Sequence, residues 1–186
     1  MNRGDSSSIQ KQKAPKQAPL PGLEKRLSAS FGGTLLKRAK GRTARPISTR
    51  DPMHLVMRST QARGAWNFRR LGNQTLVDQI VRKTASRYGV RIHEFANAGN
   101  HLHLLIRVKN RRVFQTFLRS VTGQIALKIS GSSKLKSLKK KFWDYRPFSR
   151  IVRGWRGYRV ARDYVVLNEL ETLGIVPGRP KTIQTG

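Results

Sequence analysis

The nine residues from Asn100 to Val108 alternate between two kinds of side chain. The even-numbered positions after Asn100 are all apolar: Leu102, Leu104, Ile106 and Val108. The odd-numbered positions begin with His101 and His103. Because successive side chains of a strand leave opposite faces, this pattern predicts a strand with one face in the core and two adjacent imidazoles on the other.

Two histidines at this spacing can hold one divalent cation, because neutral imidazole is a common metal ligand and both rings point the same way. A pair that merely lines a half-exposed face would show the same spacing. Two ligands are also fewer than a closed metal site needs. The spacing of His101 and His103 alone therefore leaves both interpretations open.

The balance of charge indicates a polyanionic partner. The chain has 39 Lys and Arg against 9 Asp and Glu, a formal net charge of +30. A compact fold with this charge repels itself unless a polyanion is near, and nucleic acid is the first partner to consider. The absence of cysteine excludes disulfides, thiolate metal sites and a cysteine nucleophile.

Hydropathy argues against a membrane protein. The sequence has no run of 18 or more apolar residues, and no apolar segment follows the basic residues near the N-terminus. We therefore expect a soluble, cytoplasmic protein.

Composition divides the chain into three parts. Residues 1–50 are rich in Lys, Arg, Gly, Ser, Pro and Gln without sustained apolar periodicity, so we predict a disordered basic arm. Residues 51–176 form the predicted domain, and residues 177–186 a short tail. The arm would either contact phosphates non-specifically or be a solvated tail.

Periodicity within the domain predicts an α+β fold. Strands are expected at Met53–Ser59, at Val90–Phe95, at the histidine stretch and, as an edge or bulged strand, after Pro147. Helices are expected at Thr75–Tyr88, at Val113–Ile129 and at Tyr158–Leu173. Thr75 and Asp78 have the spacing of a capping box for the first helix, and Gly89 is a plausible stop. The order predicts a ferredoxin-like antiparallel sheet with two helices on one face, plus an additional C-terminal helix that carries a tyrosine.

That last helix could complete a site on the other face. Tyr164, Asn168 and Glu171 are spaced to share one side of the helix. A phenolate can attack phosphorus while a cation neutralises charge on the transferred group, and an amide oxygen can serve as a ligand. Taken alone, Tyr164 is also compatible with a packing role.

Two segments carry a resemblance to a known family. The run from Asn100 to Leu105 resembles the histidine-hydrophobe-histidine motif of the HUH single-tyrosine transposases, and the run from Tyr164 to Asn168 resembles their terminal catalytic helix. The REP-associated tyrosine transposases are the most similar branch, over about residues 52–176. Relatives often carry Gln where Asn168 stands and Pro where Glu169 stands.

The resemblance implies a metal-dependent, single-strand-specific DNA endonuclease and strand transferase. His101, His103 and Asn168 would bind Mg or Mn. Tyr164 would attack a phosphodiester, giving a covalent 5′-phosphotyrosine and a free 3′-OH. Family substrates are imperfect hairpins formed by single-stranded DNA. It further implies a bacterial, nucleoid-associated protein, and leaves open whether it is a homodimer and whether Tyr164 acts in its own subunit.

Several basic side chains are candidate DNA contacts, and each is equally compatible with a solvated surface. They are Arg58, Arg107, Lys134, Lys136, Lys139 and Lys140. Trp66 or Trp143 could stack on an unpaired base.

Two other functions compete with transposition. One is a non-catalytic or domesticated protein that binds DNA or RNA hairpins. The other is an RNA-processing nuclease with the same fold and metal. The joint presence of His101, His103 and Tyr164 favours the enzyme, since binding alone needs none of them.

Overall fold

The computed structural model describes residues 29–34, 44–133 and 138–177. Their elements are β1 (Ser30–Phe31), β2 (Met53–Arg58), the 3-10 helix η2 (Gly64–Trp66), α2 (Asn73–Tyr88), β3 (Arg91–Asn97), β4 (His101–Arg107), α3 (Arg111–Ser130), β5 (Phe148–Ile151) and α4 (Gly154–Thr172). No helix among these residues is both long enough and apolar enough to cross a bilayer.

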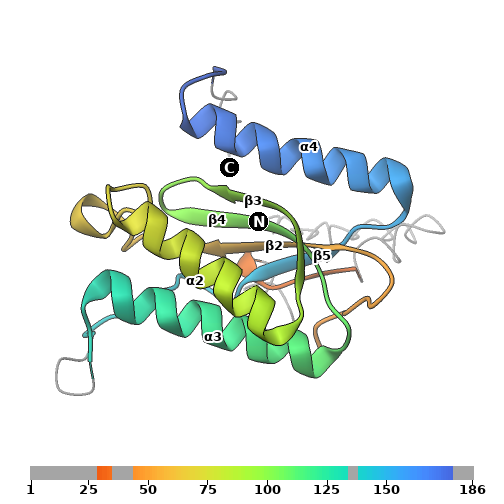
Figure 1. Ribbon diagram of the computed structural model, residues 1–186, viewed down its shortest axis with the longest axis horizontal. Coiled ribbons are helices and arrows are strands. Elements are labelled where there is room, and N and C mark those ends of the chain that lie inside the picture. The colour runs from red at the N-terminus through yellow and green to blue at the C-terminus, as the bar shows by residue number, and fades with distance from the viewer. Residues whose placement is uncertain (1–28, 35–43, 134–137, 178–186) are drawn as a thin grey trace, which may run out of the picture.

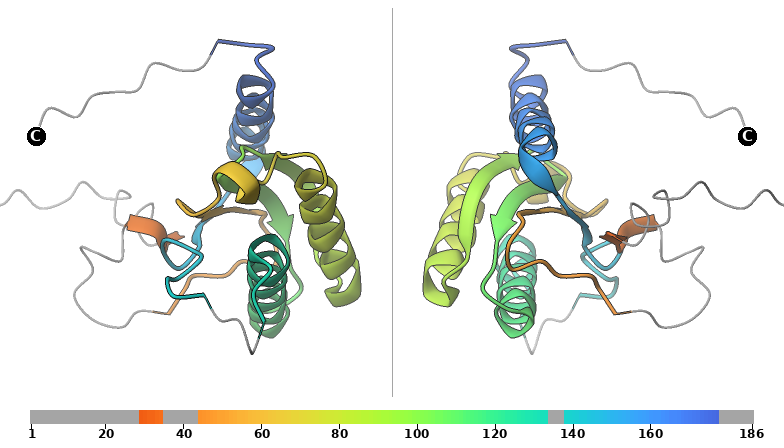
Figure 2. Two further views of the ribbon diagram at one scale, coloured as in Figure 1. Left: turned by 90° about the vertical axis from the view of Figure 1, so that its left-hand side faces the viewer. Right: turned by 90° about the vertical axis from the view of Figure 1, so that its right-hand side faces the viewer.

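The strands form one antiparallel sheet in the order β1-β5-β2-β4-β3. Helices α2 and α3 cover one face, and α4 lies alone over the other (Figure 1; both views of Figure 2). The predicted ferredoxin-like α+β fold with an additional C-terminal helix is therefore confirmed.

Apolar stripes on α2 and α3 explain why these helices close one face. On α3 the buried side chains recur every three or four residues: Phe114, Phe117, Val121, Ile125 and Ile129. They pack against the alternate strand positions predicted to face the core, among them Leu55, Leu102 and Leu104, all fully buried. The core-facing side chains thus repeat every two residues in the strands and about every 3.6 residues in the helices, and the two sets pack together at this interface.

The start of α2 differs from the prediction. The helix begins at Asn73, its N-cap is Gly72, and no side chain caps it. The predicted capping box is therefore wrong: Asp78 instead forms an i, i+4 ion pair with Arg82 at 2.8 Å. The predicted stop is confirmed, because Gly89 adopts the left-handed conformation that ends a helix.

Part of the predicted arm belongs to the sheet. Ser30 and Phe31 form β1, which pairs with β5, so β5 lies inside the sheet and its prediction as an edge strand is wrong. Gly32 makes this approach possible, because a Cβ there would overlap the carbonyl oxygen of Pro147. Residues 29–34 and 44–50 of the predicted arm are thus described with the folded unit, whereas residues 1–28 and 35–43 of the arm and 178–186 of the tail lie outside the described residues.

The arginine at position 45 also ties the segment before β2 to the sheet. The Arg45 guanidinium donates to the Ser149 hydroxyl at 2.5 Å and to the Pro147 carbonyl at 2.7 Å. Ile47 packs against the core nearby. The folded unit thus begins before residue 51.

Helix α4 buries fewer side chains than α2 and α3 do. Gly154, at φ +69°, allows the chain to reverse direction from β5 into the helix. Only Val165 on α4 is buried. The Tyr158 ring lies edge-on to His93 of β3, with ring centroids 5.5 Å apart. The helix therefore lies over β3 and β4 with most of its side chains partly exposed.

Candidate active site

The two histidines of β4 lie together on the face of the sheet beneath α4. Their ring centroids are 4.8 Å apart, and His103 is 3 % exposed. His101 Nδ1 lies 2.7 Å from the Asn100 amide oxygen. Since that oxygen only accepts, the bond holds the proton on Nδ1 and leaves the lone pair on Nε2.

A third histidine, which sequence reasoning did not include, joins the pair. His54 of β2 stacks on His103 with ring centroids 5.4 Å apart, and its Nε2 lies 3.2 Å from His103 Nδ1. If His103 coordinates through Nε2, its Nδ1 carries the proton and donates to His54. His54 then orients a ligand in the way that outer groups orient metal-binding histidines.

Burial and neighbouring arginines favour the neutral form of these rings. Burial, with a smaller effect of Arg150, lowers the pKa of His54 to about 4. The pKa of His101 is also lowered, first by burial and then by Arg58. Both imidazoles are therefore uncharged at neutral pH, the form that can bind a metal.

The α4 tyrosine lies against this cluster. The Tyr164 ring is edge-on to both His54 and His103, with centroid separations of 5.6 Å. Tyr164 is 39 % exposed, so solvent reaches the side chain while the ring contacts buried histidines. Three separate elements, β2, β4 and α4, thus bring one phenol and three imidazoles together.

Asn168 lies one helical turn beyond Tyr164. Its amide nitrogen donates to the Tyr164 carbonyl oxygen at 2.6 Å, which leaves the amide oxygen as the atom able to bind a cation. Among the described residues, no three His, Asp or Glu side chains are grouped to hold a metal ion. The donor set that fits a divalent cation here is the two imidazoles of His101 and His103, and a third described ligand would have to be of another kind, such as this amide.

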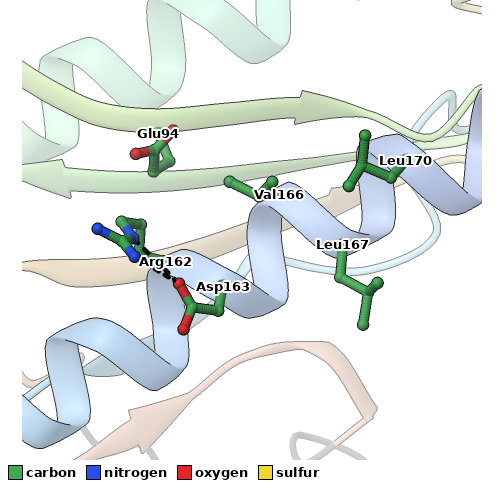
Figure 3. Close-up of a pocket in the computed structure, with 6 residues that line it drawn as sticks. All are labelled: Glu94, Arg162, Asp163, Val166, Leu167 and Leu170. Carbon is green, nitrogen blue, oxygen red and sulfur yellow. Dashed lines mark hydrogen bonds and ion pairs between the residues drawn. The ribbon is translucent and has the colours of Figure 1, made fainter.

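The acidic residues near Tyr164 face a different space. Glu94 of β3 and the α4 side chains Arg162, Asp163, Val166 and Leu170 line an open cavity of about 550 Å³ between strand and helix (Figure 3). Asp163 is paired with Arg162 at 2.8 Å, as the dashed line in Figure 3 marks. Asp163, the carboxylate closest in sequence to Tyr164, is therefore engaged in an ion pair with Arg162.

The predicted DNA contacts are dispersed. Arg58 is the register partner of His101, and its exposed guanidinium lies 3.6 Å from the Asp144 carboxylate. Arg107 is at the opposite end of β4, roughly 20 Å away at about 3.4 Å per residue. Lys139 and Lys140 line a second cavity. Lys134 and Lys136 lie outside the described residues.

These features define a class of protein: a ferredoxin-like sheet that carries a histidine pair and a helix-borne tyrosine on its sparsely covered face. The chain belongs to the IS200-like transposase family, whose sequence model matches residues 47–166. It is therefore a transposase, and the resemblance to HUH tyrosine transposases is confirmed. No curated protein matches the chain.

Two solved structures are similar to this one. A REP-associated tyrosine transposase bound to a REP hairpin is 17 % identical, with a TM-score of 0.56 over 74 % of this chain and 76 % of that one. A putative transposase from Deinococcus radiodurans R1 is also 17 % identical, with a TM-score of 0.42 over 70 % of this chain and 97 % of that one. At this identity, the first likeness establishes the fold.

Proposed function

We propose that this transposase cuts and rejoins single-stranded DNA at hairpins with Tyr164 as the nucleophile. The observation that carries the proposal is the edge-on contact of the Tyr164 ring with His103 and His54, each at 5.6 Å. A purely structural tyrosine on α4 would not need two imidazoles beneath it. A nucleophile that attacks a metal-bound phosphate needs such ligands beside it.

The chemistry balances without any co-reactant. The Tyr164 phenol oxygen bonds to phosphorus, the bond from phosphorus to the 3′ oxygen breaks, and the phenol proton is matched by the proton gained at the new 3′-OH. The product is a 5′-phosphotyrosine. Attack by another 3′-OH reverses the step, releases the phenol and joins two strands.

His101 and His103 would hold Mg or Mn through Nε2, with the Asn168 amide oxygen as the third ligand. When bound, the cation supplies Lewis-acid neutralisation of charge on the phosphate. The residues of the chain orient these ligands: Asn100 holds His101, and His54 faces His103 Nδ1. The lowered pKa of His101 reduces competition between a proton and the cation at that ring.

The proposal of hairpin DNA rests on charge and on a relative. The net charge of +30 favours a polyanion, and the solved REP-associated transposase is bound to a REP hairpin. Arg58, beside His101, is proposed to contact the strand at the site. Arg107, Lys134, Lys136, Lys139 and Lys140 are proposed as contacts farther along the DNA.

The test is covalent capture. The protein is incubated with Mn and end-labelled single-stranded hairpins, and label that stays with the chain is measured on a denaturing gel. We expect attachment by the wild type and none by Tyr164→Phe or His103→Ala. Tyr145→Phe is the matched control, since Tyr145 has the same 39 % exposure, and it should behave as wild type.

Other outcomes would replace the proposal. Tight hairpin binding without attachment or cutting indicates a non-catalytic hairpin-binding protein. Cutting that survives Tyr164→Phe, especially of RNA hairpins, indicates a nuclease that uses water.

Because Tyr164 contacts His103 of the same chain, we further propose that it acts within its own subunit. Mixing Tyr164→Phe with His103→Ala should then restore no attachment, whereas action across a homodimer would restore part of it.

A further inference from the structure

A cavity on the other side of Arg58 has no role in the proposed chemistry. It lies between η2, the end of α3 and the segment that leads to β5, and has a volume of about 350 Å³. This is within the range of small-ligand pockets. Its walls include an aromatic pair, two serines and two lysines: Trp66, Phe142, Ser130, Ser132, Lys139 and Lys140.

The aromatic wall is held in place from behind. Trp66 packs on Phe142 with ring centroids 6.4 Å apart, and Phe142 packs in turn on Phe68 and Trp143 at 6.1 and 5.1 Å. Phe142 is also fixed by its carbonyl, which accepts a hydrogen bond from the Ser59 hydroxyl. A ring so supported needs little ordering when a second ring stacks on it.

The two tryptophans considered as stacking platforms are now distinguishable. Trp143 donates its indole N–H to the Thr122 carbonyl of α3 at 3.0 Å and lies against the core. Trp66 lines the cavity, which Trp143 does not. Trp66 is therefore the ring available to a ligand.

Charge and hydroxyl groups complete the lining. Lys139 and Lys140 are exposed at the cavity. The Ser130 and Ser132 hydroxyls lie 2.8 Å apart at the end of α3. An aromatic face, flexible cations and small hydroxyl groups are the chemistry that receives a base, a phosphate and the polar edge of a base.

The cavity is also connected to the active site through the end of β2. Arg58 is opposite His101 in the sheet, and its carbonyl accepts from the Asp144 amide at 3.0 Å. Asp144 follows Phe142 by two residues, and Gln61, three residues after Arg58, lines the cavity. His101, Arg58 and the cavity therefore lie at the same end of β2.

We propose that this cavity binds one unpaired nucleotide of the substrate strand, with its base stacked on Trp66 and its phosphate between Lys139 and Lys140. This rests on the proposed function only in taking DNA as the substrate. The cavity would select strands that have a flexible tail next to the cut site.

The test measures binding, so it does not depend on chemistry. Hairpins with a ten-nucleotide single-stranded tail on either side, and blunt hairpins, carry 2-aminopurine at one tail position at a time. Base stacking quenches this fluorophore. In the full chain we expect one quenched position, tighter binding of the tailed hairpin than of the blunt one, and loss of both in Trp66→Ala. Affinity for the tailed hairpin should fall about 10-fold, in line with one stacked base, and Trp66→Phe should retain part of it.

A double lysine variant tests the proposal independently in case Trp66→Ala does not fold. Lys139→Ala with Lys140→Ala changes only exposed side chains and should also weaken tail binding, with a flatter salt dependence. Lys83→Ala with Lys109→Ala, two exposed lysines elsewhere, removes the same charge and should not. Equal affinity of the wild type for tailed and blunt hairpins, or unchanged quenching in the folded Trp66→Ala variant, would overturn the proposal. A wild type that stacks the tail yet never attaches to DNA overturns the nuclease proposal alone.

Discussion

The sheet has two faces that are packed in different ways. Beneath α2 and α3, side chains such as Phe117 and Val121 are fully buried against Leu55 and Leu104. Beneath α4, only Val165 of the helix is buried, and Val160 on the same helix is 66 % exposed. The tightly packed face holds the sheet together, whereas the other face holds polar rings in position under a helix with one buried side chain.

This contrast teaches that stability and chemistry are separable in this molecule. Most of the apolar area is buried on the α2/α3 face, so the free energy of folding depends mainly on it. The histidines and the tyrosine occupy the face that contributes less. Substitutions on the two faces should therefore fail in different assays.

The largest effect is expected at Tyr164. Tyr164→Phe removes the phenol oxygen and should abolish covalent attachment to hairpin DNA. The free energy of unfolding, measured with urea, should stay within about 0.5 kcal/mol of wild type because the ring is retained. If Tyr164→Phe lost attachment because it unfolds, the proposed separation of stability and chemistry between the two faces would be contradicted.

Phe117→Ala should have the opposite signature. It leaves a cavity between α3 and the sheet, and should lower the free energy of unfolding by about 3–5 kcal/mol in urea titrations. Leu127→Ala, on the same helix but 52 % exposed, is the control and should change it by less than about 1 kcal/mol. Equal losses in the two variants would mean that α3 is not the principal packing partner.

The pH dependence of the unfolding free energy should reveal the contribution of His54, on the face beneath α4. His54 has a folded-state pKa of about 4, below its usual 6.5, so the unfolded chain binds a proton that the folded one excludes. The stability due to this difference is present above pH 6.5 and is lost as the pH falls towards 4, by about 3 kcal/mol. With EDTA present, the unfolding free energy of His54→Gln should therefore fall less steeply over this range. Parallel curves for the variant and the wild type would contradict this assignment.

The smallest effect is expected on the outer side of α4. Val160→Ala should change the unfolding free energy by less than about 0.5 kcal/mol, because the side chain is mostly exposed. Val121→Ala deletes the same groups from the buried side of α3 and should cost roughly 2 kcal/mol. A larger cost at Val160 than at Val121 would reverse the proposed contrast between the faces.

Much of this arrangement could be predicted from local patterns. The alternation around His101 and His103 predicts β4, and the helical spacing of Phe114 and Phe117 predicts α3, because each pattern lies within a single element. The side chain of Tyr164 was expected on the same face as Asn168 for the same reason. Periodicity is encoded in consecutive residues, so one sequence suffices to read it.

The parts that could not be predicted depend on how elements pair. His54 reaches His103 because Val56, two residues further along β2, is the register partner of His103. No spacing along the chain encodes that register. Strand β1 is two residues long and has no period to detect. A polar residue was expected at the start of α2, but Gly72 begins the helix without a side-chain cap.

The pairing of β1 with β5 also sets an order of events during synthesis. Ser30 pairs with Arg150, so β1 cannot join the sheet until translation has passed β5. Contacts with such large sequence separation form slowly, because closing the intervening loop is entropically costly. The hairpin of β3 and β4 joins neighbours and can form early, whereas α4, made after β5, arrives later. A nascent chain would therefore display its histidines before it acquires Tyr164, and the proposed active site would be incomplete until translation had passed α4.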